Sequence, residues 1–455
     1  MYMKVLWLIN APIPALCERA GLPVQVKEGW IDGLYNSLMA LVKEKNVDFK
    51  LAIAFPQFAK RETIEGELDG SEFYGFYKEE DKPYKYNPNV EGRLRDILAK
   101  AAPDVVHIAG TEYDHAAAMV RAFGRPDRTV VSIQGLTSVY ARHYMADLPV
   151  SVRYGFTLRD VLKLDNLFFD RKKYYKRGAL EKETIRGAGH IIGRTDWDNI
   201  CTRLINPTAK YYYCSEILRR DFYDGSRWSA DDCDKHTIFV SQGYYPIKGL
   251  HYMLEALKDI RKFYPDVKLR VAGGVSLNDE GFKNRLRQKN YQRYLSKLIV
   301  KYNLSDCVEF LPPLKADEMK KMYLKSNVFV SPSSIENSPN SLGEAMILGV
   351  PCVSSLVGGV GNMLIDGVEG FFYQHDAPYM LAFYVMRIFE TQDRQREQLV
   401  YMTDAAHAHA ERLFDRRKNA EQMLEIYGEV KSEGNAGSTA SNARGMQGDK
   451  FENEN

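Results

Sequence analysis

Residues 326–351 read Ser-Asn-Val-Phe-Val-Ser-Pro-Ser-Ser-Ile-Glu-Asn-Ser-Pro-Asn-Ser-Leu-Gly-Glu-Ala-Met-Ile-Leu-Gly-Val-Pro. The apolar run at 327–330 predicts a short buried strand. Ser338 and Pro339 predict the start of a helix, and Gly349 predicts its end. We therefore expect a strand, a loop and a helix. In an open parallel sheet such a junction lies at the edge where ligands bind.

Two glutamates accompany the predicted helix start. Glu336 lies in the loop, and Glu344 lies inside the helix, roughly 7 Å beyond its start along the axis. The free N–H groups and partial positive charge of a helix N-terminus favour a phosphate, and carboxylates accept hydrogen bonds strongly from hydroxyl groups. The pair indicates a ligand with a phosphate and many hydroxyls. The alternative is two solvated glutamates on a surface helix.

The spacing of this pair resembles a known element. Glu336 and Glu344 are separated by seven residues, and this pair resembles the Glu-x7-Glu element of the retaining glycosyltransferases of family 4. Members of that family have the two-domain GT-B fold. The flanking Asn-Ser-Pro, Gly-Glu-Ala and Gly-Val-Pro pieces also resemble that family. The resemblance implies an α/β fold in which two Rossmann-like, doubly wound parallel-sheet domains face a central cleft.

The composition fits two sizeable globular domains. The chain has 455 residues, of which 45% are hydrophobic and 27% charged, and its net charge of +2 gives no global field for nucleic acid. Six scattered cysteines without a Cys-x-x-Cys pair argue against a zinc knuckle or disulfide scaffold and favour a reducing cytoplasm. No apolar run approaches the roughly 20 residues needed to span a bilayer, so any membrane contact should be peripheral.

Strands and helices alternate along most of the chain, which is typical of parallel sheets with helices on both faces. No Gly-x-Gly-x-x-Gly follows the first predicted strand, which argues against a nicotinamide site. With the resemblance, the alternation predicts four segments. They are an acceptor-side domain at 1–215, a nucleotide-sugar-binding domain at 216–395, helices at 396–431 that cross back to the first domain, and a tail at 432–455. The tail is expected to be disordered, because its composition cannot bury enough surface to fold.

A second cluster lies at 242–249, where a predicted strand ends and a helix opens. Lys248 can neutralise a phosphate there as a point charge, although a Lys-Gly at a helix start is often a simple turn. The cluster resembles the donor-phosphate loop of family 4, but Gln242 and Gly243 stand where the family has Gly-Arg. Either Arg194 replaces the missing arginine, or Lys248 acts with backbone N–H groups alone.

The resemblance implies roles for individual residues. Glu336 and Lys248 would carry catalysis, Glu336 by placing the donor sugar and Lys248 by stabilising the departing diphosphate. Glu344 would accept hydrogen bonds from the ribose hydroxyls. The other donor-binding candidates are Asn340, Ser341, Leu342, Gly243, Gly29, Gln134, Arg194 and Gly359. Gln134 takes the place of a histidine that contacts the transferred sugar in many relatives.

Residues 151–183 differ from the rest of the first domain, because Lys and Arg alternate there with Phe, Tyr and Leu. A basic, aromatic helical segment can lie on an anionic membrane surface. The alternative is a helical hairpin that packs on its own domain and leaves its charges solvated.

The resemblance implies a retaining hexosyltransferase that moves a sugar from a UDP- or GDP-linked donor to a glycan or lipid-linked acceptor in surface polysaccharide assembly. The resemblance implies no cofactor and no essential metal, and a place in the cytoplasm at the inner face of the cell membrane. Two alternatives stay open: a non-catalytic subunit that binds a sugar nucleotide or glycan, and a GT-B epimerase.

Overall fold

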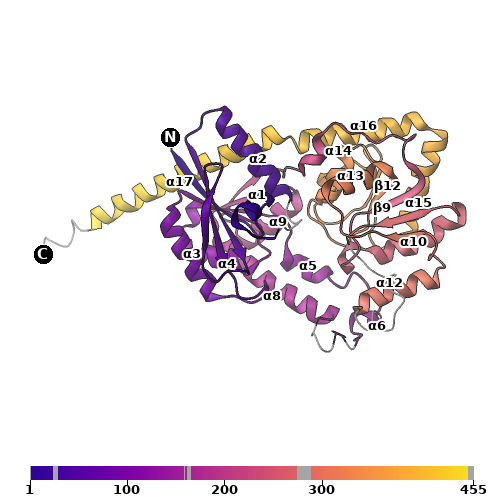
Figure 1. The fold of residues 1–455 in the computed structure, drawn as a ribbon, viewed down its shortest axis with the longest axis horizontal. Helices are drawn as coiled ribbons and strands as arrows, with labels where there is room; N and C mark the ends of the chain where they lie inside the picture. The colour runs from indigo at the N-terminus through magenta and orange to yellow at the C-terminus, as the bar shows by residue number, and fades with distance from the viewer. Residues whose placement is uncertain (1, 24–28, 158, 161–164, 274–287, 449–455) are drawn as a thin grey trace.

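The computed structural model describes residues 2–23, 29–157, 159–160, 165–273 and 288–448. The chain forms two lobes side by side, and each lobe is built on its own sheet (Figure 1). This architecture confirms the prediction of two doubly wound α/β domains.

The first lobe contains an eight-stranded sheet in the order β3-β4-β2-β1-β5-β6-β7-β8. All neighbours pair in parallel except β3, which is antiparallel to β4. The strands are β1 (Met3–Leu8), β2 (Phe49–Gln57), β3 (Ile64–Leu68), β4 (Ser71–Tyr77), β5 (Val105–Ala109), β6 (Thr129–Ser132), β7 (His190–Gly193) and β8 (Lys210–Tyr213). The helices are α1 (Pro14–Ala20), α2 (Gly29–Glu44), α3 (Pro88–Ala101), α4 (Asp114–Phe123), α5 (Thr137–His143), α6 (Val150–Arg153), α8 (Leu167–Arg186) and α9 (Asp196–Ile205).

The second lobe contains a six-stranded parallel sheet in the order β11-β10-β9-β12-β13-β14. The strands are β9 (Asp234–Val240), β10 (Lys268–Val271), β11 (Val308–Phe310), β12 (Ser326–Ser331), β13 (Cys352–Ser355) and β14 (Phe371–Tyr373). The helices are α10 (Leu250–Phe263), α12 (Asn290–Lys301), α13 (Ala316–Lys325), α14 (Asn340–Ile347) and α15 (Pro378–Arg394).

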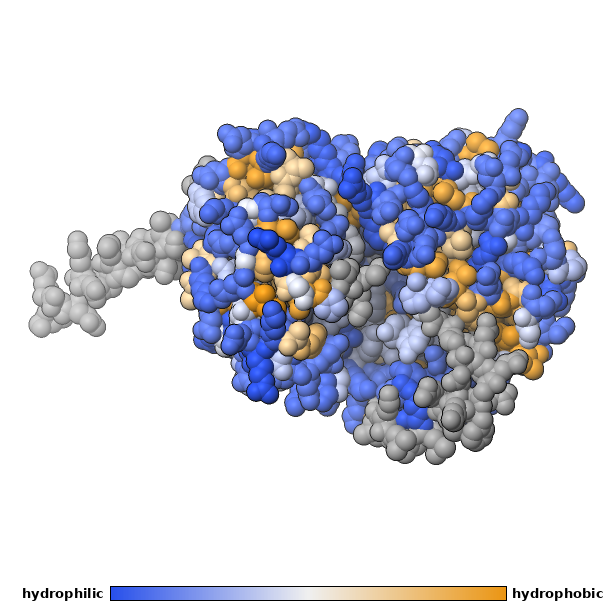
Figure 2. Space-filling model, viewed as in Figure 1, coloured by the Kyte–Doolittle hydropathy of each residue, from blue (hydrophilic) through white to orange (hydrophobic). Residues whose placement is uncertain are grey.

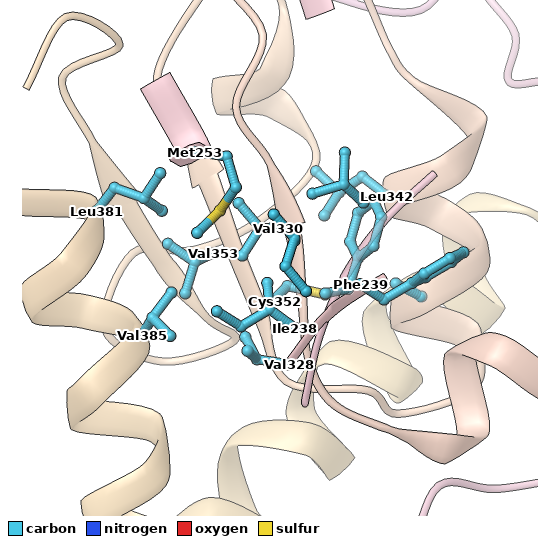
Figure 3. Packing of buried hydrophobic residues seen from close by; sticks show 14 of the residues in the cluster. Ile238, Phe239, Met253, Val328, Val330, Leu342, Cys352, Val353, Leu381 and Val385 are labelled. Atoms are coloured by element: carbon cyan, nitrogen blue, oxygen red, sulfur yellow. The ribbon is translucent and has the colours of Figure 1, made fainter. Parts of the chain in front are cut away.

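Strands β12 and β13 of the second sheet are buried along their whole lengths, as expected when helices cover both faces. Figure 3 shows Val330 of β12 and Val353 of β13 packed with Met253 of α10 and Leu381 of α15 on one side. Leu342 of α14 lies on the other side (Figure 3). This packing fixes the strand ends from which the site loops emerge.

The stretch from β12 to α14 has the predicted order of strand, loop and helix, but the helix begins at Asn340 and not at Pro339. Pro339 is the N-cap, with an extended ψ of 118°, and its carbonyl accepts the Leu342 N–H at 2.9 Å. The expected cap Ser338 therefore lies outside the helix. Gly349 follows the last turn with a φ of +71°, a conformation that favours glycine.

Two helices close the described chain. α16 (Arg396–Leu413) packs against α14 and α15 in the second lobe. α17 (Arg416–Gly448) packs against α2, β1 and β5 in the first lobe and extends beyond it (Figure 1). The two helices therefore link the lobes a second time.

The expectation of a disordered tail from residue 432 is wrong as far as residue 448, because α17 continues through this segment. Extending an existing helix avoids the cost of nucleation. The Lys210 ammonium also contacts Glu433 at 2.9 Å, which ties the start of the segment to β8. Residues 449–455 lie outside the described part of the chain.

The basic, aromatic segment at 151–183 forms the end of α6 and most of α8, while residues 158 and 161–164 lie outside the described residues. The inner face of α8 packs against α4 and α5. The outer surface exposes large apolar side chains together with lysines. These residues are Val150, Tyr154, Phe156, Phe168, Tyr175, Lys172 and Lys176. In the part of the chain that the structure describes, no helix is long and apolar enough to cross a bilayer.

Candidate active site

A cleft of about 370 Å³ lies between the lobes, at the carboxyl ends of their parallel strands. Figure 2 shows the molecule hollowed between the two lobes. The strand order changes direction between β1 and β5 in the first sheet and between β9 and β12 in the second. Ligands bind at such positions in open α/β sheets.

Both lobes line this cleft. The first lobe contributes Trp30, Glu112, Gln134, Gly135, Thr137, Tyr140, Tyr174, Arg177, Arg194 and Glu216. The second lobe contributes Gln242, Tyr245, Ile247, Lys248, Glu336, Asn337, Ser338, Pro339 and Asn340. The lining includes both charged and aromatic side chains, which suits a polar ligand with flat faces.

The two predicted catalytic side chains meet in the cleft. Lys248 follows β9 and Glu336 follows β12, and the Lys248 Nζ lies 2.5 Å from the Glu336 Oε1. The Ser333 hydroxyl donates to the same carboxylate oxygen at 2.8 Å. Gly249 holds the lysine turn in place: its φ is +70°, and a Cβ there would lie 1.7 Å from the Pro332 carbonyl oxygen. The ammonium and the carboxylate therefore stand on two loops that are locked together.

The start of α14 lies at the same cleft as Lys248 and Glu336. Asn340 lines the cleft, and its Nδ2 donates to Glu216 Oε2 at 2.6 Å. Leu342 differs from the expectation for a ligand contact, because its side chain lies in the core and its N–H already donates to Pro339. The N–H groups of Asn340 and Ser341 remain the helix donors nearest the cleft.

Glu344 lies one turn further along α14 and is almost fully buried. Arg219 donates two hydrogen bonds to the Glu344 carboxylate, from Nε at 2.7 Å and from Nη2 at 2.8 Å. Burial raises the pKa of the Glu344 carboxyl, and the Arg219 guanidinium opposes this rise. The Tyr323 hydroxyl also donates to Glu344 Oε2 at 3.4 Å, and Glu344 is not among the residues that line the cleft.

Arg194, the expected replacement for the missing arginine, lines the cleft but is bonded to protein groups. Its Nη1 lies 2.9 Å from Glu216 Oε1, and its Nη2 donates to the Gln134 carbonyl oxygen at 2.7 Å. Its Nη1 also donates to the Ser338 carbonyl oxygen at 3.3 Å, across the lobes. Burial raises the pKa of Glu216, against the effect of the Arg194 charge. Arg194 therefore holds the cleft walls together.

Asn337 joins the two lobes at the back of the cleft. Its Nδ2 donates to Asp198 Oδ2 at 2.8 Å, and its Oδ1 accepts the Thr195 hydroxyl at 2.7 Å. Gly359 allows this close approach, because a Cβ there would lie 2.5 Å from the Thr195 Oγ1. Asn337 belongs to the Asn-Ser-Pro piece that resembles the family, but it was not among the predicted site residues.

The other predicted glycines lie beside the cleft and not in its lining. Gly243 stands where the family has an arginine. It packs closely against Leu250, because a Cβ at this position would lie 2.6 Å from the Leu250 side chain. A Cβ on Gly29 would lie 2.6 Å from Arg219. Gln134 does line the cleft, and among the described residues its Nε2 has no hydrogen-bond partner.

Several cleft residues escaped the sequence reasoning, notably Trp30, Glu112, Tyr140, Tyr174 and Arg177. They come from the first lobe, where the resemblance is loose. Glu112 follows β5 as Lys248 and Glu336 follow β9 and β12, so its place after a predicted strand was the signal that could have found it.

Residues 227–406 match the family model described as "Glycosyl transferases group 1". The matched part contains Lys248, Glu336 and Glu344 and covers most of the second lobe. Similarity to this family thus falls on the domain that carries both predicted catalytic residues.

Two curated relatives match a similar share of the chain. D-inositol 3-phosphate glycosyltransferase of Corynebacterium urealyticum is 27% identical over 183 residues, which are 40% of this chain and 40% of that protein. Lipopolysaccharide 1,2-N-acetylglucosaminetransferase of Salmonella typhimurium is 25% identical over 161 residues, which are 35% of this chain and 40% of that protein. The chain therefore spans about two fifths of the length of these relatives.

Solved structures match nearly the whole chain. Sucrose-phosphate synthase from Thermosynechococcus elongatus has a TM-score of 0.67 at 15% identity, over 94% of this chain and 99% of that one. HepE from Anabaena, in complex with UDP and glucose, has a TM-score of 0.59 at 15% identity, over 94% and 100%. At these identities the likeness shows the fold. The second lobe thus matches the glycosyl transferases group 1 family, and the whole chain has the two-domain GT-B fold.

Proposed function

We propose that the protein is a retaining glycosyltransferase of the family 4 type, which moves a hexose from a UDP- or GDP-linked donor to a glycan or lipid-linked acceptor. The observation that carries the proposal is the meeting of Lys248 and Glu336 beside the start of α14, within the part that matches group 1 transferases. The named relatives are sugar transferases, and one structural neighbour holds UDP and glucose.

The donor diphosphate would lie against the first N–H groups of α14 and the Lys248 ammonium. Lys248 is paired with Glu336, so a bound phosphate would compete for the ammonium and leave Glu336 to accept hydrogen bonds from the sugar. The ribose hydroxyls would donate to Glu344, and they would have to replace one of the donors that its carboxylate now has, Arg219 or Tyr323. Each group then meets the part of the donor that its charge suits.

In the transfer step, the acceptor oxygen bonds to the anomeric carbon while the bond from that carbon to the diphosphate oxygen breaks. The acceptor proton passes to the departing phosphate on the same face, which retains the configuration. Lys248 and the helix N-terminus stabilise the charge that develops on the phosphate, which is usually the largest catalytic term. The proposal includes no essential metal or cofactor and places the enzyme in the cytoplasm.

A second candidate is a non-catalytic protein that binds a sugar nucleotide. It is favoured by Gly243, which stands where the family has an arginine, and by Arg194, which is bonded to Glu216 and to backbone carbonyls. Less cationic charge is then available to stabilise a leaving group. A GT-B epimerase would bind the same donor but release a changed sugar without an acceptor.

A thermal-shift series distinguishes ligand binding from its absence. We expect one of UDP, GDP and ADP to raise the melting temperature of the wild-type protein, because a ligand at a hundred times its Kd stabilises the folded state by about 2.7 kcal/mol. Slow release of that diphosphate from the matching sugar nucleotide would follow if the protein is a transferase. Binding without release would favour the second candidate, and no shift with any of them would refute the proposal.

We also propose that the surface of α6 and the first half of α8 contacts an anionic membrane. Phe156, which follows α6, is 57% exposed, and Tyr175 on α8 is 46% exposed. Lys172 and Lys176 of α8 are exposed next to Tyr175. Apolar insertion and basic attraction to anionic lipids act together in such segments. α8 continues from this surface to Arg177 in the cleft, so a lipid-linked acceptor would have a short path to the site.

If this surface contacts a membrane, removing its lysines should weaken the binding of the protein to anionic vesicles, and this binding should be sensitive to salt. The double variant Lys172→Ala/Lys176→Ala should bind phosphatidylglycerol vesicles roughly thirtyfold more weakly, because each basic residue near an anionic surface contributes about 1 kcal/mol. Co-sedimentation measures this, with Lys43→Ala/Lys60→Ala, two exposed lysines elsewhere in the lobe, as the control. Equal binding to neutral phosphatidylcholine vesicles, or an equal loss in the control, would contradict the proposal.

A further inference from the structure

The loop between β5 and α4 places a carboxylate on the first-lobe side of the cleft. The Gly135 N–H donates to Glu112 Oε1 at 3.3 Å, and the Arg177 Nε donates to the Glu112 carbonyl oxygen at 2.8 Å. Two neighbouring elements therefore fix the residue in position. It lies at the switch point of the first sheet, opposite the residues that the proposed function assigns to the donor.

The second carboxylate oxygen of this residue is buried and unsatisfied. Glu112 Oε2 finds no hydrogen-bond partner among the residues that the structure describes, and Gln134 Nε2 is in the same position. Both crowd around Gly110, where a Cβ would lie 2.5 Å from Glu112 Oε2 and 3.4 Å from the Gln134 Cδ. Buried polar groups normally have partners, so an unpaired acceptor and an unpaired donor on side chains that both lie near Gly110 point to a missing ligand group.

A hydroxyl group satisfies both atoms at once, since it donates one hydrogen bond and accepts others. The cleft wall next to Glu112 carries aromatic rings from Trp30, Tyr140 and Tyr174. Such rings offer flat apolar faces with polar edges, which match the faces of a sugar ring. The site therefore favours a neutral saccharide.

We propose that Glu112 binds the hydroxyl group of the acceptor saccharide, which donates to its Oε2 next to the Gln134 amide. This inference rests on the proposed transferase function and adds the acceptor side to it. Gln134 is expected beside the transferred sugar. An acceptor hydroxyl bound to the nearby Glu112 would therefore lie close to the anomeric carbon of that sugar. Glu112 thus orients the attacking oxygen and needs to take no proton from it.

The ionisation of this carboxyl gives the subsite a pH dependence. Burial raises the pKa of Glu112 to about 7, while the Arg177 charge lowers it and the Glu181 charge raises it. Lys248 and Glu336 are the charged groups that line the cleft from the second lobe. A carboxylate accepts hydrogen bonds better than a neutral carboxyl, so saccharide binding should be about tenfold weaker at pH 6 than at pH 8.

The test is the binding of simple saccharides to the full-length protein saturated with UDP, measured by saturation-transfer difference NMR; GDP or ADP replaces UDP throughout if that is the diphosphate that raises the melting temperature. The probes are the methyl glycosides of glucose, galactose, mannose and N-acetylglucosamine. Glu112→Gln should weaken the best-bound glycoside at least tenfold at pH 8 and remove the difference between pH 6 and pH 8. Its affinity for UDP should stay within twofold of wild type, and Glu67→Gln on the exposed edge strand β3 should change neither.

The outcomes separate this inference from the function on which it rests. If wild-type protein fails to bind UDP and the other diphosphates, the proposed function fails and the inference falls with it. If UDP binds but no glycoside does, or if Glu112→Gln binds glycosides as wild type does, only the role of Glu112 is overturned. A wild-type affinity for glycosides that is equal at pH 6 and pH 8 counts against the role even if the variant does not fold.

Discussion

Lys248→Ala is expected to lower sugar transfer about 100- to 1,000-fold, the usual loss when one preorganised group that stabilises developing charge is removed. The cleft offers little to replace it. Gly243 stands where the family has an arginine, and Arg194 is bonded to Glu216 and to carbonyl oxygens. On the second-lobe side of the cleft, the leaving diphosphate would then depend on the start of α14.

The same variant should remain folded. The Lys248 side chain is about a quarter exposed, and Glu336 keeps its hydrogen bond from Ser333 when the ammonium is gone. Transfer rates and melting temperatures of Lys248→Ala and of the control Lys262→Ala, an exposed lysine of α10, measure the difference. A Lys248→Ala enzyme that keeps a third of wild-type turnover would show that another group stabilises the diphosphate.

The fold was predictable where the chain has buried strands and helical periodicity, and less so at the sheet edges. The hairpin of β3 and β4 was not predicted, because β3 is polar and mostly exposed. Asp69 and Gly70, both with positive φ, join the two strands, and an Asp-Gly pair between strands is a hairpin signal that could have found them. Strand β8 was not predicted either, because its three tyrosines show no alternation with polar residues.

The candidate site was predictable where its residues share a short stretch of sequence. Glu336, Asn340 and Glu344 fall within one strand, loop and helix, so their spacing carried the prediction. The rest of the site depends on hydrogen bonds between residues that are distant in sequence. Arg219 donates to the Glu344 carboxylate, and Asn337 donates to the Gln134 carbonyl oxygen. A single sequence does not record such contacts, because they depend on how the two lobes meet.

The C-terminal helix is another case in which distant contacts decide the structure. Tyr427 of α17 is fully buried, and its hydroxyl lies 2.8 Å from Trp7 Nε1 on β1 and 2.6 Å from His107 Nδ1 on β5. Its ring also stacks on Phe49 of β2 at 6.4 Å between centroids. Burial lowers the pKa of His107 to about 3, so the imidazole is neutral at pH 7. One side chain thus joins α17 to three strands of the first sheet.

Tyr427→Ala should destabilise the first lobe by about 3–5 kcal/mol, the usual cost of replacing a buried aromatic ring with alanine. Tyr427→Phe keeps the ring but leaves the Trp7 and His107 nitrogens without their shared partner, and should cost about 1–3 kcal/mol. Urea unfolding followed by tryptophan fluorescence and circular dichroism measures both. Tyr401→Ala, at a side chain 69% exposed on α16, should change stability by less than about 0.5 kcal/mol. Equal effects of Tyr427→Ala and Tyr401→Ala would mean that α17 does not contribute to the core of the first lobe.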